Sequence, residues 1–301
     1  MKIYISANSS ALSALNLDAT VEAEYGDTVV IGSILTLAHH GQRSGRPCPC
    51  SFMNFPKLGI ESVGVSHVDL DTIGGIMSLM GTKPFQNNWV QEFWRVAAEI
   101  DVKGVHKLHE IPLGGVAEDY ILDSLNAWWA FSESPEGRVF APRDGSATEV
   151  DLSHHFEVIK KLLTPQEGEE WYDEPQWDNP ARLALIEAGR AWAAAKARLD
   201  EESLVEDLGN VLLRSSDQFT NHLYRAAKSV VSFNTKTKSV TVSLSDPVKG
   251  VSCREVVQTL WGTEAGGHDG IAGSPRGKEM SFDDAVAAAS VIMASLYMVT
   301  D

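Results

Sequence analysis

The most restrictive feature of the sequence is a short apolar strand that runs directly into acidic residues. Residues 62–67 form this β-type run, which continues through Asp69 and Asp71 into a Gly-Gly pair. Side chains alternate along a strand, so His67, Asp69 and Asp71 should share one side at its C-terminal tip. Such a group predicts a site for Mn²⁺ or Mg²⁺, with Zn²⁺ less favoured. The alternative is an acidic turn in which Asp71 caps the following helix.

Length and the order of the expected elements predict two α/β domains. At 301 residues the chain exceeds what one hydrophobic core usually fills. The expected strands of the first half are residues 2–6, 28–37 and 62–67, and the expected helices are 72–80, 88–100, 116–131 and 151–163. Strands followed by helices predict a mainly parallel sheet, which we assign to an N-terminal metal-binding domain over residues 1–170.

The second half of the chain changes character. Residues 164–180 are rich in acid, Pro and Trp and indicate a boundary or hinge. The elements expected after it are an Ala-rich helix at 182–198, strands at 229–234 and 239–245, a helix at 253–261 and a last helix at 285–298 capped by Ser281. We therefore expect a linker with a connecting helix over 171–222 and a smaller α/β domain over 223–301.

The charge balance excludes some partners. Lys and Arg total 25 against 41 Asp and Glu, and the formal charge of -16 would repel a long duplex nucleic acid. A small anionic substrate is still allowed, because a metal and a few cations can reverse the field in one cleft. The sequence shows no secretory signal and no apolar run of about 20 residues, so we expect a cytoplasmic protein without a membrane partner. Three cysteines argue against a disulfide framework and predict thiols without a ligand role.

A Gly-rich loop at residues 262–277 is the second segment suited to chemistry. Gly266 and Gly267 would let backbone amides approach a phosphate closely, and His268 and Arg276 could donate to its oxygens. The loop therefore predicts a phosphate-binding cradle. In the alternative, the glycines serve turns only.

Two pairs of adjacent histidines are also candidates. His39 and His40 follow a predicted strand and precede Arg43, a local cationic cluster that could bind a metal or clamp substrate phosphates. His154 and His155 lie in a helical pattern, where neighbouring side chains point about 100° apart. We expect a role in the cleft for the first pair and a structural role for the second.

The two chemical segments resemble those of DHH-family phosphoesterases. His67-Val-Asp69-Leu-Asp71 is similar to the His-x-Asp-x-Asp signature of RecJ-like members. Residues 230–277 resemble the DHH-associated C-terminal domain, whose Gly-Gly-His loop here reads Gly266-Gly267-His268. The name-giving Asp-His-His motif has no literal match, and its candidates are Ala38-His39-His40 and Ser153-His154-His155.

The resemblance implies a phosphoesterase that hydrolyses a small phosphate ester or anhydride with metal-activated water. His67, Asp69 and Asp71 would be ligands of Mn²⁺ or Mg²⁺, and Asp101 would be a bridging ligand. The glycine-rich loop would bind the substrate phosphate through His268 rather than hold the metal. We expect the active cleft between the domains, with this loop facing the tip of the strand at 62–67.

Two alternatives stay open. The missing Asp-His-His favours a DHH-like module that binds or senses a nucleotide without cleaving it. The same ligands would also serve a metal-dependent hydrolase of a non-phosphate substrate. The sequence leaves open which phosphorylated substrate is used, among them a short oligonucleotide, a cyclic dinucleotide, a bisphosphorylated nucleotide or polyphosphate. It also leaves open the number of ions and whether the chain forms a homodimer.

Overall fold

The N-terminal sheet is mostly parallel, as the order of strands and helices predicts. In the computed structural model, which describes residues 1–113, 118–165 and 179–299, the strand order is β5-β2-β6-β1-β7. The strands are β1 (Lys2–Ile5), β2 (Ala19–Val21), β5 (Leu35–Leu37), β6 (Ser62–Val65) and β7 (Thr148–Val150). Only the edge strand β7 is antiparallel to its neighbour. The carboxyl ends of β5, β2 and β6 therefore meet at one edge of the sheet.

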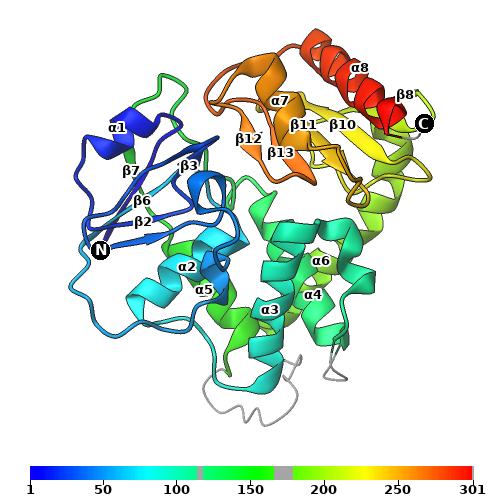
Figure 1. Ribbon diagram of the computed structural model, residues 1–301. Coiled ribbons are helices and arrows are strands. Elements are labelled where there is room, and N and C mark those ends of the chain that lie inside the picture. Colours follow the sequence, from blue (N-terminus) through cyan, green and yellow to red (C-terminus); the bar gives the residue numbers. More distant parts are fainter. Residues whose placement is uncertain (114–117, 166–178, 300–301) are drawn as a thin grey trace.

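Helices cover this sheet and complete its core. They are α1 (Ser9–Ser13), α2 (Leu70–Met80), α3 (Asn88–Lys103), α4 (Glu118–Ser132) and α5 (Ser153–Leu163), with short 3-10 turns η1 (Gly41–Arg43), η2 (Pro49–Ser51) and η3 (Val105–Glu110). Ile5, Val63 and Val65 of the strands share one buried cluster with Trp94 of α3 and Trp128 of α4. A small hairpin, β3 (Glu24–Tyr25) and β4 (Thr28–Val29), projects beyond the sheet edge toward the second half of the molecule (Figure 1).

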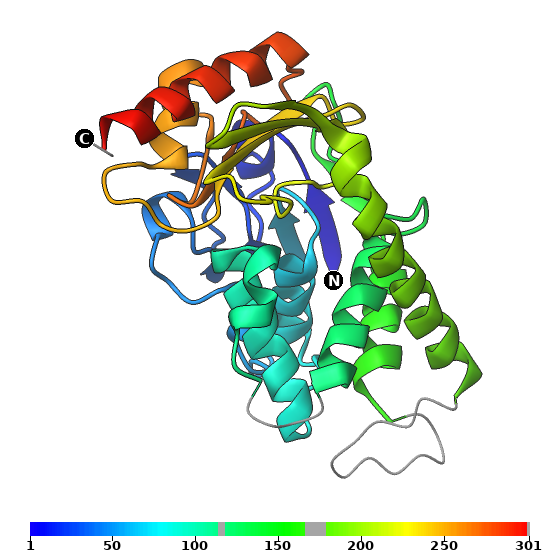
Figure 2. The same cartoon turned by 90° about the vertical axis from the view of Figure 1, so that its right-hand side faces the viewer.

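The C-terminal half is built on a second, mixed sheet. Its strand order is β12-β13-β11-β10-β9-β8, and only β9 and β10 run parallel. The elements are β8 (Leu204–Asp207), β9 (Val211–Ser216), β10 (Ser229–Asn234), β11 (Ser239–Leu244), α7 (Cys253–Trp261), β12 (Gly266–Gly267), β13 (Ile271–Gly273) and α8 (Phe282–Met298). Helices α7 and α8 cover the outer face of the sheet (Figures 1 and 2). The overall class is therefore α/β, as predicted.

The long helix α6 (Pro180–Ser203) joins the two halves. It packs against α4 at the base of the molecule and leads directly into β8 (Figure 2). The buried guanidinium of Arg214 on β9 donates to Asp200 near the end of α6, which fixes the helix against the sheet. Since β8 and β9 are part of the second sheet, that sheet begins within residues 171–222, which the sequence assigned to the linker.

Several boundaries differ from those expected. The single strand expected at 28–37 is two short strands, β4 and β5, that belong to different sheets. Most of the expected hinge at 164–180 lies outside the described residues. Elements with strong local sequence signals agree with the prediction. Helix α7 has the predicted bounds, and Ser281 caps α8 in a capping box with Asp284. None of the described helices has the length and hydropathy needed to cross a membrane.

The two halves are in contact through the β3–β4 turn. Gly26 approaches the glycine-rich loop so closely that a Cβ at Gly26 would lie 2.0 Å from the carbonyl oxygen of Thr263. Asp27 forms an ion pair with Arg254 of α7, next to this contact. A second contact joins η3 to the end of β11, where His106 Nε2 donates to the carbonyl of Ser245 at 2.8 Å. These contacts hold the glycine-rich loop against the edge of the N-terminal sheet.

We predict that Gly26→Ala destabilises the protein more than Gly59→Ala does. Both glycines have positive φ, +61° and +70°, so both substitutions incur backbone strain of roughly 1 kcal/mol or more. Only Gly26 has atoms within reach of the new methyl group, whereas Gly59 has none within 4 Å. Thermal unfolding of both variants measures the difference. Equal losses of stability would show that the close approach at Gly26 is not a feature of the folded protein.

Candidate metal centre

Three neighbouring parallel strands deliver acidic and histidine side chains to one point. Glu22 follows β2, His39 and His40 follow β5, and His67 follows β6. Because these strand ends lie side by side at the same edge of the sheet, side chains distant in sequence converge there. Glu22 has φ +49°, an uncommon conformation for a residue with a side chain, and its carboxylate is only 1% exposed. Strained backbone of this kind is concentrated at functional sites.

His39 is the centre of the first group of donor atoms. Its Nε2 lies 3.1 Å from Asp101 Oδ2, 3.3 Å from Asp71 Oδ2 and 3.5 Å from Glu22 Oε1. Neighbouring ligand atoms on a divalent ion with bonds of about 2.1 Å lie about 3.0–3.4 Å apart, depending on the geometry. Glu22, His39 and Asp71 are buried, and Asp101 is partly exposed at the cleft, so the three carboxylates share one imidazole at its inner wall.

A second group of donor atoms adjoins the first. His40 Nε2 lies 3.4 Å from Glu22 Oε2 and 4.0 Å from Glu24 Oε2. The two oxygens of Glu22 therefore face different histidines, as a carboxylate would when it bridges two ions. His40 and Asp101 also form a possible ligand group with His39 and His268, all within 4.8 Å of one another. The arrangement therefore offers donor groups for more than one ion.

Hydrogen bonds fix the far atoms of these side chains. Asp71 Oδ1 accepts from the backbone N–H of Cys50 at 2.7 Å, and Glu24 Oε1 accepts from that of His40 at 2.7 Å. His39 Nδ1 contacts Cys48 Sγ at 3.4 Å. Outer contacts of this type orient metal-binding side chains and set the histidine tautomer. Cys48 is buried, as expected for a thiol, but it lies closer to the donor cluster than the sequence indicates.

The near atoms, by contrast, have no hydrogen bond among the described residues. They are Glu22 Oε1, Glu24 Oε2, His39 Nε2, Asp71 Oδ2, Asp101 Oδ2 and His268 Nε2. Buried polar atoms are normally paired, and each unpaired one costs about 1–3 kcal/mol. His39, Asp71 and Asp101 belong to one possible ligand group, and Glu22, Glu24 and His40 belong to another, so bound cations would satisfy these atoms. Nitrogen and carboxylate oxygen donors suit Mn²⁺ and Zn²⁺, and carboxylates also suit Mg²⁺.

Burial shifts the protonation of this centre when no cation is present. Removal from water raises the pKa of Glu22 to about 8 and that of Glu24 to about 7. Burial also lowers the pKa of His40 and His268 to about 4. For His39 burial acts in the same direction, but contacts with Asp101 and Asp71 outweigh it and raise the pKa. Without a cation, therefore, burial opposes ionisation of Glu22 and Glu24, and the only imidazole here whose pKa is raised is that of His39, which faces the carboxylates.

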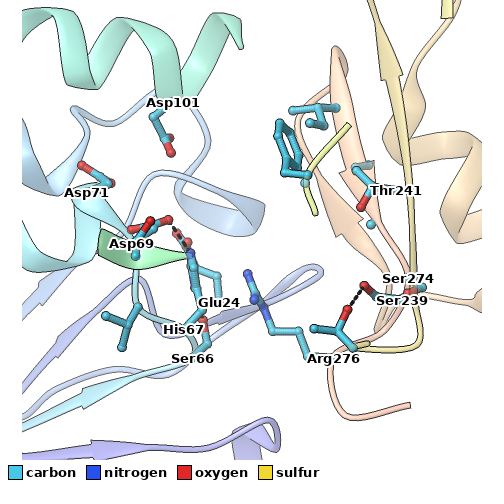
Figure 3. A pocket seen from close by; sticks show the side chains of 18 of the residues that line it. Glu24, Ser66, His67, Asp69, Asp71, Asp101, Ser239, Thr241, Ser274 and Arg276 are labelled. Carbon is cyan, nitrogen blue, oxygen red and sulfur yellow. Dashed lines mark hydrogen bonds and ion pairs between the residues drawn. The ribbon is translucent and has the colours of Figure 1, made fainter. Parts of the chain in front are cut away.

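The predicted motif at the tip of β6 divides into two parts. Asp71 belongs to the donor cluster, whereas His67 and Asp69 form a separate pair with Nε2 and Oδ2 2.8 Å apart. Asp69, not Asp71, caps α2, because its Oδ1 accepts from the backbone N–H of Thr72 at 2.8 Å. Figure 3 shows both Asp69 and His67 on the wall of the cleft, below Asp71 and Asp101. Their spacing suits either a hydrogen bond or two ligands of one ion.

The glycine-rich loop faces this centre from the second half. The His268 ring lies 4.0 Å from that of His40 and 5.4 Å from that of His39, centroid to centroid. Gly266 and Gly267 form the short strand β12 next to it, and Gly267 has φ +145°, which only glycine adopts readily. Arg276 extends its guanidinium across the cleft toward His67 and Glu24 (Figure 3).

A cleft of about 990 Å³ joins these elements and continues along α4 and α6. Predicted residues that line it are His40, His67, Asp69, Asp71, Asp101, Gly266, Gly267, His268 and Arg276. His39 lies behind them in the buried cluster, and Arg43 is half-buried in η1 outside the cleft lining. His155 is elsewhere: its Nε2 donates to the carbonyl of Gly137 at 2.9 Å. Of the two candidate pairs, only His39-His40 lies at the centre.

Sequence reasoning missed Glu22 and Glu24. Both are buried, and both lie among the apolar residues of Val21-Glu22-Ala23-Glu24-Tyr25. Acidic residues are rarely buried unless they are paired. Two glutamates that alternate with apolar residues were therefore the sequence feature that could have indicated a buried site. It was hidden because β2 has only three residues and was not expected as a strand.

Comparisons with known proteins identify no family for this chain. No protein-family model and no curated protein matches the chain. One similar solved structure is described as an uncharacterized protein from Helicobacter pylori G27, with 13% sequence identity and a TM-score of 0.20. The match covers 69% of this chain and 53% of that one, so the chain spans about half of its length. At this TM-score the likeness supports no conclusion about fold or function.

We predict that His268→Ala keeps its bound metal, whereas Asp101→Asn loses most of it. Glu22, His39, Asp71 and Asp101 all belong to the N-terminal half and provide four donors without His268. Metal content per chain, measured after equilibration with Mn²⁺ and desalting, tests this division. The control is Asp283→Asn, an exposed carboxylate in the first turn of α8. Metal loss in His268→Ala equal to that in Asp101→Asn would identify the histidine as a ligand.

Proposed function

We propose that this protein is a metal-dependent phosphoesterase that hydrolyses a small phosphate ester or anhydride. The supporting observation is the convergence of buried, unpaired carboxylate and imidazole atoms at one end of a cleft whose opposite wall is a glycine-rich loop with His268. The first half provides donors for a cation and the second provides donors for an anion. This division is the one that the DHH-like motifs imply.

In this proposal the N-terminal residues hold the cation and orient it. Oxygens of Glu22, Asp71 and Asp101 all face His39 Nε2. The hydrogen bond from Cys50 holds Asp71 in place, and the contact with Cys48 holds His39. When bound, a divalent ion would lower the pKa of a water molecule and neutralise charge on phosphate oxygens. His67 and Asp69 line the cleft beside this point, where they could add ligands or exchange protons with substrate.

The second half would position the phosphate. His268 and the backbone of Gly266 and Gly267 face the centre, and Arg276 extends toward it from the far wall. A guanidinium can bind two phosphate oxygens at once, and backbone amides beside glycines can approach an oxyanion closely. Donors that meet developing negative charge typically contribute about 10²-fold in rate each.

The set of donor atoms favours hydrolysis over the alternative of a nucleotide-binding or sensing module with an incomplete metal site. That alternative rested on the absence of an Asp-His-His sequence. Here His39 supplies an imidazole to the centre although Ala38 precedes it, and Glu22 and Glu24 add carboxylates that no motif includes. The donor set is therefore rich enough to hold a cation without that motif.

The proposal predicts Mn²⁺-dependent hydrolysis that Asp71→Asn and Asp69→Asn abolish. Asparagine keeps the acceptor oxygen that Asp71 offers to Cys50 and the cap that Asp69 provides to α2, so the fold should be retained. The assay is a panel of phosphomonoesters, phosphodiesters and inorganic polyphosphates, with circular dichroism as the folding check and Asp283→Asn as the matched control. Near-normal turnover in Asp71→Asn at saturating Mn²⁺ would contradict the proposal. Hydrolysis of carboxylic esters alone would favour the non-phosphate alternative.

A further inference from the structure

A short loop that does not line the cleft contacts the candidate metal centre from behind. This back loop consists of residues 48–52, which include η2. The backbone N–H of Cys50 donates to Asp71 Oδ1 at 2.7 Å, and Cys48 Sγ lies 3.4 Å from His39 Nδ1. Both contacts are made with the far atoms of side chains whose near atoms face the centre. The position of the back loop therefore sets the orientation of two of these side chains.

A pair of glycines lets the back loop lie close to α2, the helix that carries Asp71. A Cβ at Gly74 would lie 2.6 Å from the Cβ of Cys50, and a Cβ at Gly75 would lie 2.7 Å from the Cβ of Pro49. Side chains at these two positions would push the loop away from the helix, because packed carbon atoms do not approach so closely. The Gly-Gly pair that follows the acidic motif thus permits the hydrogen bond between Cys50 and Asp71.

The side chain of Lys83 holds the back loop in this position. Lys83 is only 3% exposed, and its Nζ donates to the carbonyls of Cys50 and Phe52, to the second at 2.6 Å. The main chain of Lys83 is fixed as well. Its N–H donates to Asn54 Oδ1 at 2.9 Å, and its carbonyl accepts from Asn54 Nδ2 at 3.0 Å. One buried amine therefore joins two carbonyls of the loop to a fixed point of the fold.

The surroundings of the Lys83 amine leave these carbonyls as its main partners. Nζ lies 4.5 Å from the centre of the Trp94 ring and 5.2 Å from that of Phe85. In the described part of the chain it forms no ion pair with a carboxylate. Burial lowers the pKa of Lys83 to about 8, so most of the amine is still charged at neutral pH. Hydrogen bonds from a charged donor are stronger than those from a neutral one.

We propose that Lys83 is a positioning residue of the metal centre, which acts through the back loop on Asp71 and His39 without touching the ion. The inference rests on the metal centre of the proposed function and extends it to a residue outside the cleft. Without the amine, the Cys50 carbonyl is released, and the N–H of the same residue no longer holds Asp71 Oδ1 in a fixed place. Loss of such outer contacts typically lowers metal affinity about 10–100-fold.

The affinity for Mn²⁺ tests this role in the full-length protein. Lys83→Met keeps most of the apolar body of the side chain and removes the amine. We expect its Kd for Mn²⁺ to rise about 10–100-fold, measured by electron paramagnetic resonance of the free ion during a titration. The resonance spectrum of the bound ion at saturation should also change, because Asp71 is no longer fixed. If Lys83→Met does not fold, Lys83→Gln is the second variant, since its amide reaches one atom less far than the amine.

The matched control is Arg182→Met. Arg182 is also a buried cation that donates to two backbone carbonyls, those of Lys161 at 2.8 Å and Thr164 at 3.0 Å, but it does not line the cleft. Its replacement should lower the thermal unfolding temperature and leave both the affinity for Mn²⁺ and the spectrum of the bound ion unchanged.

The outcomes separate this inference from the proposed function. Unchanged affinity and spectrum in a folded Lys83 variant would overturn the inference and leave the metal centre intact. An equal loss of affinity in Arg182→Met would also overturn it, because the effect would then follow general stability. Failure of the wild-type protein to bind Mn²⁺ would overturn the proposed function together with the inference. Since metal binding is the readout, the result for Lys83 does not depend on which ester, if any, is cleaved.

Discussion

The structure depends on the mutual burial of carboxylates around one imidazole. Glu22 and Asp71 are withdrawn from water beside His39, and the partly buried Asp101 completes the group. No Lys or Arg among the described residues forms an ion pair with any of the three carboxylates. Taking several charges out of water is costly unless an opposite charge compensates them. A divalent cation is the neutralising charge that fits the donor types and their spacing.

The topology explains why the group forms where it does. Strands β5, β2 and β6 are parallel neighbours, so the residues that follow them meet at one edge although up to about 45 positions separate them in sequence. The glycine contact at Gly26 then brings the second half over this edge, and His268 reaches the centre. The cleft is thus a product of both halves. The end of the cleft beside His39 is lined by acidic and histidine side chains, whereas the end along α4 and α6 is lined by aromatic ones.

The sequence predicts the parts of this molecule that depend on local signals. Periodicity and capping residues located α7 and the capped start of α8, and strand–helix order predicted the parallel sheet. The motif at 67–71 located Asp71, but alternation alone could not show that Asp69 turns back to cap α2. The sequence did not predict Glu22 and Glu24 as site residues because their position depends on tertiary contacts. Only the pairing of β2 between β5 and β6 brings them to His39 and His40. Strands as short as β2 leave too weak a pattern to detect.

The central claim is that the unpaired atoms around His39 bind a divalent ion. Anomalous diffraction at the manganese absorption edge, from crystals equilibrated with Mn²⁺, tests it most directly because it locates the ion without reference to activity. The account predicts a strong peak about 2.1 Å from His39 Nε2 and from the facing oxygens of Asp71 and Asp101, with a second peak near His40 if Glu22 bridges two ions. An ordered centre with no peak at these atoms, and Mn²⁺ only at exposed carboxylates, would contradict it.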